Sequence, residues 1–101
     1  MTWRSRKYLD AIHDLPCLVQ SPACIGITTG AEPAHSDQGE DGKGTGIKAH
    51  DLMSAAACHP CHLWLGGTAP RGERNWYMDR GIKRTIRAMV ERGVLVVGRT
   101  T

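Results

Sequence analysis

The sequence has no phenylalanine and only five aromatic residues, three Trp and two Tyr, in a chain of 101 residues. A chain of this length forms one domain and buries roughly 60–70% of the surface that its unfolded state exposes. With so few large side chains, the hydrophobic core contributes limited stability. We therefore expect a single domain, residues 1–101, in which a metal cross-link contributes much to the fold.

The sequence also lacks long apolar runs. No window approaches the roughly 20 apolar residues of a membrane span. The N-terminal residues Met1 to Arg4 lead into a charged segment without the apolar stretch of a secretory signal. These absences predict a cytoplasmic protein with no membrane partner. In that reducing compartment, four cysteines indicate a metal site rather than disulfides.

Charge is unevenly distributed along the chain. Residues 1–66 hold five Lys or Arg and seven Asp or Glu, whereas residues 67–101 hold eight and three. A basic C-terminal third favours contact with phosphates, although charge alone is equally compatible with a solvated helix face. The residues expected to contact nucleic acid are Lys83, Arg84 and Arg87.

Three segments are predicted to be helical. Residues 4–13 place apolar side chains on one face and basic ones opposite. A second, short helix starts near Pro60 and ends at Gly66. Residues 75–92 carry an apolar stripe at helical spacing and form one or two helical pieces, interrupted near Gly81.

The remaining segments predict strands, turns and one long loop. Residues 25–29 form a strand or part of a long turn, and residues 51–57 form a second strand. Residues 36–46 are polar and glycine-rich, and long ordered loops in small domains are usually functional. Residues 68–74 form a polar turn, and residues 94–97 form a short closing strand.

The cysteines occur as two pairs. Cys58 and Cys61 are separated by two residues, which lets both sulfurs reach one ion, and Cys17 and Cys24 are separated by six. Zinc prefers four thiolate or imidazole ligands, and no cysteine is left over. The pattern predicts one structural zinc ion. Buried free thiols and a redox-active CxxC pair are the alternatives, but no thioredoxin-like βαβ pattern accompanies the pair.

Two of the five histidines stand at informative positions. His35 immediately precedes the glycine-rich loop, and His62 directly follows the second cysteine pair. A zinc ion shared by the two pairs would bring these imidazoles to one side of the domain. His59, between the cysteines, is a possible spare zinc ligand, and His13 has no assigned role. The alternative for His35 and His62 is a structural one, as hydrogen-bonded imidazoles near the zinc.

This order of residues resembles the His-Me finger endonucleases in their zinc-bearing, HNH-like form. Small prophage-encoded nucleases of the YbcO type are the most similar group. The resemblance covers residues 4–66 well and the rest loosely, and only the combined pattern is specific. It is carried by Cys17-Leu-Val, Cys24, Ala34-His35, Gly44-Thr45-Gly46-Ile47-Lys48, Asp51-Leu52, Ala57-Cys58 and Cys61-His62.

The resemblance implies an α+β fold with a small zinc-stapled ββα-metal core, residues 4–66, flanked by N- and C-terminal helices. Residues 67–101 would be a basic helical extension. The implied function is a metal-dependent endonuclease of phage or prophage type that hydrolyses phosphodiester bonds of DNA. His35 would be the general base, and His62 would ligate Mg²⁺ or another divalent cation. Asp51 would either orient the His35 ring or lie in the second shell of the cation.

Two positions depart from the family's pattern. Ala34 stands where many HNH sites carry an acidic metal ligand, and Asp51 lies two residues further from the cysteine pair than the usual Asn. Either the cation has few protein ligands, or Asp37 or another loop acid contributes, or catalysis is weak or lost. Lys43 in the glycine-rich loop could meet a phosphate, with a plain surface loop as the alternative.

Two other functions stay open on these grounds. One is a non-catalytic zinc-knuckle module that binds nucleic acid, and the other is a zinc-stapled adaptor between proteins. Cation-dependent cleavage would indicate the nuclease, and salt-sensitive binding without cleavage would indicate the binding module. The sequence leaves DNA versus RNA and the oligomeric state open.

Overall fold

Two short antiparallel strands form the centre of the fold in a computed structural model that describes residues 3–44, 49–96 and 98. Strand β1 (Glu32–His35) pairs with strand β2 (Ser54–Ala57), with the first residue of β1 opposite the last of β2. Every residue of β2 is buried, three of them alanines. Because these side chains are small, helices can approach both faces of the hairpin closely.

Helix α1 (Arg6–Ile12) lies against one face of the hairpin. Ser5 caps it by accepting a hydrogen bond from the Tyr8 backbone N–H at 3.1 Å, which satisfies one orphan donor of the first turn. Its buried side chains Tyr8 and Ile12 belong to a core cluster with Leu15, Ala31, Ala56 and Met89. The helix predicted for residues 4–13 is therefore present, with slightly shorter ends.

Helix α2 (His59–Leu65) follows β2 after a single residue. Pro60 occupies its first turn, where backbone N–H groups have no partner within the helix, so the missing N–H of proline costs nothing. Gly66 ends the helix. Cys61 and Leu65 point into a second core cluster together with residues of β1, β2 and the long helix. The chain thus runs strand, loop, strand, short helix, the order that the resemblance implies.

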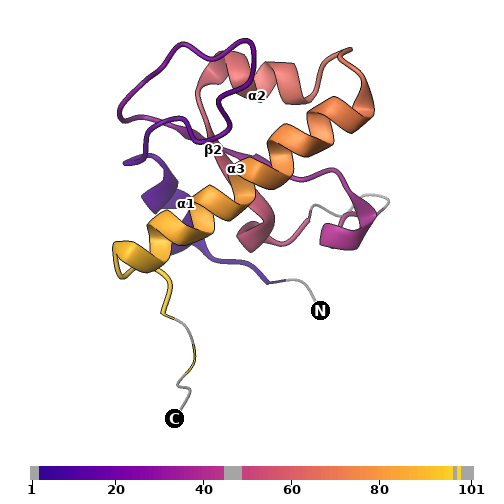
Figure 1. Cartoon of the computed structure of the whole chain (residues 1–101). Helices are drawn as coiled ribbons and strands as arrows, with labels where there is room; N and C mark the ends of the chain where they lie inside the picture. The colour runs from indigo at the N-terminus through magenta and orange to yellow at the C-terminus, as the bar shows by residue number, and fades with distance from the viewer. Residues whose placement is uncertain (1–2, 45–48, 97, 99–101) are drawn as a thin grey trace.

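Helix α3 (Arg71–Glu91) is one continuous helix that crosses the hairpin, with α2 near its first turns and α1 near its last ones (Figure 1). The predicted interruption near Gly81 is wrong. A Cβ atom at Gly81 would lie 2.9 Å from both Ala55 Cβ and Val19 Cγ2. The glycine therefore allows close packing of an unbroken helix on β2 rather than a break.

Other boundaries also differ from expectation. Residues 25–29 form no strand, and β1 comes later, at Glu32–His35. The predicted strand 51–57 starts with a 3-10 helix, η2 (Asp51–Met53), before β2, and the polar turn 68–74 ends where α3 begins. Residues 94–96 are irregular rather than a strand, and Val97 lies outside the described residues.

The glycine-rich loop connects β1 to η2. Its described part contains a 3-10 helix, η1 (Gly39–Asp41), and Ser36 Oγ donates to the Asp41 carboxylate at 2.6 Å. Residues 45–48, which include part of the predicted loop, lie outside the described residues. Within the described part of the chain, no helix is both long and apolar enough to span a membrane.

Candidate metal centre and adjoining pocket

The four cysteines converge at one point. The Sγ atoms of Cys17, Cys24, Cys58 and Cys61 all lie within 4.8 Å of one another. A tetrahedral zinc site with Zn–S bonds of about 2.3 Å places its sulfurs about 3.8 Å apart, so the cluster needs little movement to fit the ion. No disulfide forms among these four residues. The cluster is consistent with a structural zinc site.

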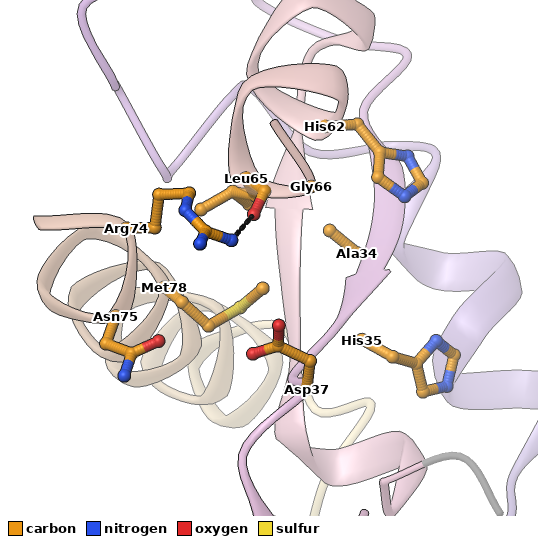
Figure 2. Close-up of a pocket in the computed structure, with 9 residues that line it drawn as sticks. All are labelled: Ala34, His35, Asp37, His62, Leu65, Gly66, Arg74, Asn75 and Met78. Atoms are coloured by element: carbon orange, nitrogen blue, oxygen red, sulfur yellow. Dashed lines mark hydrogen bonds between the residues drawn. The ribbon is translucent and has the colours of Figure 1, made fainter. Parts of the chain in front are cut away.

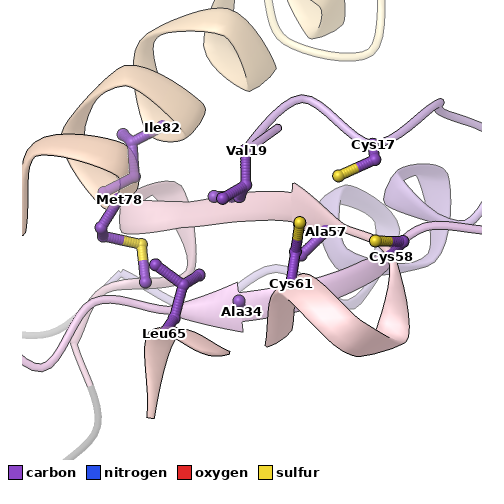
Figure 3. Close-up of a cluster of buried hydrophobic side chains, with 10 residues drawn as sticks. Cys17, Val19, Ala34, Ala57, Cys58, Cys61, Leu65, Met78 and Ile82 are labelled. Carbon is purple, nitrogen blue, oxygen red and sulfur yellow. The ribbon is translucent and has the colours of Figure 1, made fainter. Parts of the chain in front are cut away.

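Two segments far apart in the sequence supply the thiols. The first pair is fastened to the hairpin because the N–H groups of Leu18 and Val19 donate to the Ala56 carbonyl at 2.8 and 3.3 Å. The second pair brackets the start of α2, with Cys58 at its N-cap. Figure 3 shows three of the sulfurs at one end of a core cluster whose other end is formed by Leu65, Met78 and Ile82.

Polar groups support the sulfurs. Ser21 Oγ lies 3.0 Å from Cys61 Sγ, and the Gly26 N–H donates to Cys24 Sγ at 3.4 Å. Burial raises the pKa of the Cys61 thiol to about 12, and burial together with Cys17 and Cys58 raises the pKa of Cys24. Burial would also raise the pKa of the Cys17 thiol, but hydrogen bonds, the first of them from the Cys58 backbone, outweigh it and lower this pKa. The protein alone therefore disfavours thiolates at Cys24 and Cys61, and a bound cation would supply the compensating charge there.

A second constellation lies at the end of β1. His35 Nε2 is 2.9 Å from Asp51 Oδ1, so the residue that ends β1 contacts the residue that begins η2. The side chain of His35 is 19% exposed and that of Asp51 is 6% exposed. His35 Nδ1 makes no hydrogen bond with the described residues. An Nε2–H···carboxylate bond leaves Nδ1 as the basic nitrogen.

The N-terminal segment holds Asp51 in place. The Ser5 N–H donates to Asp51 Oδ2 at 2.7 Å, and Arg4 Nη1 lies 3.1 Å from Oδ1. Burial alone would raise the pKa of the Asp51 carboxyl, but hydrogen bonds from His35, Ser5 and Arg4 outweigh it and hold this pKa below its usual range. Asp51 is therefore a carboxylate with a fixed orientation toward the imidazole.

A second imidazole–carboxylate pair faces the first. His62 Nδ1, on α2, lies 2.7 Å from Glu32 Oε1, on β1, and His59 Nδ1 lies 3.1 Å from Glu32 Oε2. The contact with His62, more than that with His59, lowers the pKa of the Glu32 carboxyl despite partial burial. His62 Nε2 makes no hydrogen bond with the described residues, which leaves it free to act as a donor to a cation.

The two histidines line one cavity. A pocket of about 140 Å³ lies between the hairpin, the end of α2 and the first turns of α3. Figure 2 shows the imidazoles of His35 and His62 on one side of Ala34, with Asp37 between the hairpin and α3. The lining residues are Ala34, His35, Asp37, His62, Leu65, Gly66, Arg74, Asn75 and Met78.

The pocket carries charge of both signs. Arg74 is fixed at its rim because Nε donates to the Ala69 carbonyl at 2.7 Å and Nη1 donates to the Leu65 carbonyl at 3.2 Å. Asp37 lies 3.7 Å from Arg71 in an exposed ion pair. An adjoining hollow of about 310 Å³ is lined by His35, Asp37 and His62 and also by Lys43. Lys43 is thus close to His35 and His62.

Other predicted contacts lie elsewhere. Lys83 and Arg87 are exposed on α3, and Arg84 Nη1 donates to the Gln20 side chain at 2.8 Å. None of the three lines the cavity between His35 and His62. Among the described residues, the four cysteines form the only group of three or more His, Cys, Asp or Glu ligand atoms within 4.8 Å of one another. A preformed cage of carboxylates for a second cation is therefore absent from the described part of the site.

Two residues of the site were missed from sequence. Glu32 was overlooked because residues 25–29, rather than 32–35, were expected to extend toward the loop. Had β1 been placed correctly, Glu32 and Ala34 would share a face, and Glu32 would point toward the helix after β2. Arg74 fell in a predicted turn, whereas it is the fourth residue of α3.

Comparison of the chain with protein-family models, curated proteins and solved structures finds no match.

Proposed function

We propose that this protein is a metal-dependent endonuclease of the His-Me finger type that hydrolyses phosphodiester bonds of DNA. The observation that carries the proposal is the pair of imidazoles, His35 and His62, lining one cavity while each is hydrogen-bonded to its own carboxylate. The order β1, loop, β2, α2 supports it, because this is the order that the resemblance implies. The same resemblance implies that the protein is of phage or prophage origin.

His35 acts as general base in this proposal. Asp51 accepts a hydrogen bond from Nε2–H, orients the ring and stabilises the imidazolium that forms when Nδ1 takes a proton from the attacking water. The resulting hydroxide forms a bond to phosphorus, and the bond from phosphorus to the leaving oxygen breaks. An imidazole suits the step because its ordinary pKa lies near neutral pH.

His62 supplies a nitrogen donor for a divalent cation, with Glu32 fixing the ring so that Nε2 is the donor. Asp37, which lines the same cavity, is the nearest carboxylate candidate for the place that Ala34 cannot fill. A bound divalent cation would stabilise charge developing on the phosphate and on the leaving oxygen. One imidazole and one carboxylate suit Mn²⁺ or Ni²⁺ at least as well as Mg²⁺.

The phosphate has cationic neighbours. Arg74 and Lys43 flank the cavity from α3 and from the loop, and their side chains carry positive charge at any physiological pH. The four cysteines, in this proposal, hold a structural Zn²⁺ that joins the segment of residues 17–24 to the start of α2. The zinc thereby fixes the helix that carries His62 and takes no part in the chemistry.

A specific observation favours a second function, a non-catalytic zinc-knuckle module that binds nucleic acid. Carboxylates do not converge on His62 Nε2 in the described residues, and Asp37 is paired with Arg71. If no cation binds there, the basic residues of α3 would still contact phosphates. The two functions differ in whether the bound strand is cut.

Plasmid nicking tests the proposal. Purified protein is incubated with supercoiled DNA and Mg²⁺, Mn²⁺ or Ni²⁺, alongside His35→Ala and the matched control His13→Ala, which removes an exposed imidazole distant in sequence from the cavity residues. We expect cation-dependent nicking by the parent and by His13→Ala, and a loss of roughly 10²–10⁴-fold in His35→Ala. Salt-sensitive binding without nicking under any cation would establish the binding module instead.

A further inference from the structure

An exposed aromatic cluster lies where α3 meets α2. Trp76 is 56% exposed and packs edge-on against Tyr77, with ring centroids 4.9 Å apart, and Tyr77 packs edge-on against Trp64 of α2 at 5.2 Å. Asn75 and Met78 line the cavity and flank these two rings in sequence, but successive helical residues point about 100° apart, so Trp76 lies on a different face of α3 from Met78. An exposed tryptophan in a chain with few aromatics stabilises the core little.

Arg80 makes the cluster rigid. Its guanidinium lies 4.7 Å from the centroid of the Trp76 ring and 5.2 Å from that of Tyr77. The same group donates to the carbonyls of Val19 and Gln20 at 3.3 and 3.4 Å. Because the cation and the rings are ordered by these contacts, a ligand that stacks on Trp76 would lose little side-chain entropy on binding.

The cluster continues into a basic track along α3. Trp76, Arg80, Lys83 and Arg87 are spaced by four, three and four residues, so they share one face of the helix. The opposite face carries the buried residues Met78, Ile82, Thr85 and Met89. Lys83 and Arg87 are exposed, and the pair that Arg87 forms with Glu91 at 3.4 Å joins two exposed side chains. Exposed ion pairs of this kind contribute little to stability, so Arg87 can exchange Glu91 for a phosphate at little cost.

We propose that this face of α3, defined by Trp76, Arg80, Lys83 and Arg87, binds single-stranded nucleic acid, with one unpaired base stacked on Trp76 and the strand's phosphates on the basic track. The proposal rests on the proposed nuclease function and gives its substrate a class: a strand that carries unpaired nucleotides. Aromatic faces bind bases that are free to unstack, whereas the bases of a duplex are covered by their neighbours.

Charge favours this occupant over a protein partner. Lysine is depleted in the buried centres of protein interfaces, and here Lys83 stands in the middle of the face between two arginines. One exposed ring followed by three cations along a helix suits a flexible strand, which offers an unstacked base and successive phosphates.

Binding of a labelled twelve-nucleotide oligothymidylate and of a duplex of equal length, both followed by fluorescence anisotropy, tests the proposal on the full chain. We expect the single strand to bind more tightly than the duplex. Trp76→Leu, which keeps apolar area but removes the ring, should weaken single-strand binding roughly 5–150-fold, and Trp76→Phe should restore most of it. Leu63→Ala, which removes an exposed apolar side chain from α2, serves as the matched control and should leave binding unchanged.

The dependence of binding on salt concentration distinguishes stacking on Trp76 from the phosphate contacts of the basic residues. Between about 50 and 200 mM salt, Trp76→Leu should keep the parent's slope of log affinity against log salt, whereas Lys83→Gln combined with Arg87→Gln should flatten it. Equal binding of the strand by Trp76→Leu and the parent would overturn the proposal, as would tighter binding of the duplex. Absence of binding to either nucleic acid would overturn it in favour of a protein partner.

The failure of this inference is distinguishable from that of the proposed function. Plasmid nicking by the same preparations reports on cleavage at the pocket that holds His35 and His62. Nicking with no effect of Trp76→Leu on strand binding would leave the nuclease and remove the stacking site. Strand binding that depends on Trp76, without nicking under any divalent cation, would leave the stacking site and remove the nuclease.

Discussion

The cysteine cluster and the histidine pocket adjoin the same core and differ in how closed they are. Cys58 and Cys61 have no exposed surface and Cys17 has 3%, whereas the side chains of His35 and His62 are 19% and 44% exposed. Four thiols satisfy a tetrahedral ion completely, and such closed sites contribute to folding. The imidazoles, each backed by a carboxylate, keep one nitrogen free for a ligand. If the proposed function holds, the cysteine cluster provides stability and the histidine pocket provides the chemistry.

The largest effect is expected from a substitution in the cysteine cluster. Cys58→Ala removes one of four ligands, and structural zinc contributes on the order of 10 kcal/mol to folding in small modules. This matches or exceeds the whole stability of a typical domain, about 5–15 kcal/mol. We expect an unfolded or insoluble chain without zinc, checked by circular dichroism and elemental analysis.

Ser21→Ala is the matched control for that change. It removes the hydroxyl 3.0 Å from Cys61 Sγ but no ligand, so the variant should keep one zinc per chain and remain folded. A folded Cys58→Ala protein that melts as the parent does, or a parent without zinc and with four titratable thiols, would contradict the assignment of this cluster as a structural metal site.

The next largest effect concerns only the histidine pocket. His35→Ala and Asp51→Asn should keep the zinc, because neither residue belongs to the cysteine cluster. His35→Ala should lower cleavage by roughly 10²–10⁴-fold. Asp51→Asn should also lower cleavage, because an amide stabilises the imidazolium less than a carboxylate does. Plasmid nicking and elemental analysis of the same samples measure both properties. Loss of zinc in His35→Ala would show that the two regions are one site.

A smaller effect tests the cation. Glu32→Gln keeps a hydrogen-bond acceptor for His62 but removes the charge that fixes and polarises the ring, and changes of this kind typically weaken a metal 10–100-fold. The concentration of Mn²⁺ that gives half-maximal nicking should rise by that factor, while the maximal rate changes less. Glu40→Gln, on the exposed part of the loop, is the control. An unchanged Mn²⁺ requirement in Glu32→Gln would remove His62 as the cation's ligand.

The two regions were predictable from sequence to different extents. The convergence of the cysteines followed from spacing, because a tetrahedral ion restricts which side chains can meet. The contact between His35 and Asp51 was also anticipated, through the resemblance. Glu32 was not, because its role depends on which strand residues face α2, and a one-residue error in a strand reverses the face. Local sequence patterns therefore predict candidate ligands more easily than they predict the carboxylates that orient those ligands.

Gly81 shows the same limit in the fold. A glycine within a helical pattern predicts a weak point, since glycine costs about 1 kcal/mol relative to alanine in a helix interior. Sequence could not reveal that β2 and Val19 approach this position closely enough to exclude a side chain. Tertiary packing therefore reversed the local expectation, and α3 continues unbroken past Gly81.

The smallest predicted effect comes from adding a methyl group at Gly81, where α3 packs closely on β2. Gly81→Ala inserts a methyl group 2.9 Å from Ala55 Cβ and Val19 Cγ2, so α3 must shift or the core must expand. Overpacking of this kind costs about 1–3 kcal/mol, which the gain in helix propensity only partly offsets. Gly72→Ala, in the exposed first turn of the same helix with nothing within 4 Å, should be neutral or stabilising by up to about 1 kcal/mol.

The two alanine variants should also differ in which region they disturb. Helix α3 supplies Arg74, Asn75 and Met78 to the pocket but no ligand to the cysteine cluster. Gly81→Ala should therefore lower the melting temperature by roughly 4–8 °C for each kcal/mol lost, and reduce nicking, while its zinc content stays at that of the parent. Differential scanning calorimetry and elemental analysis measure these quantities together. Zinc loss in Gly81→Ala would mean that the position of α3 is also required to hold the four cysteines together.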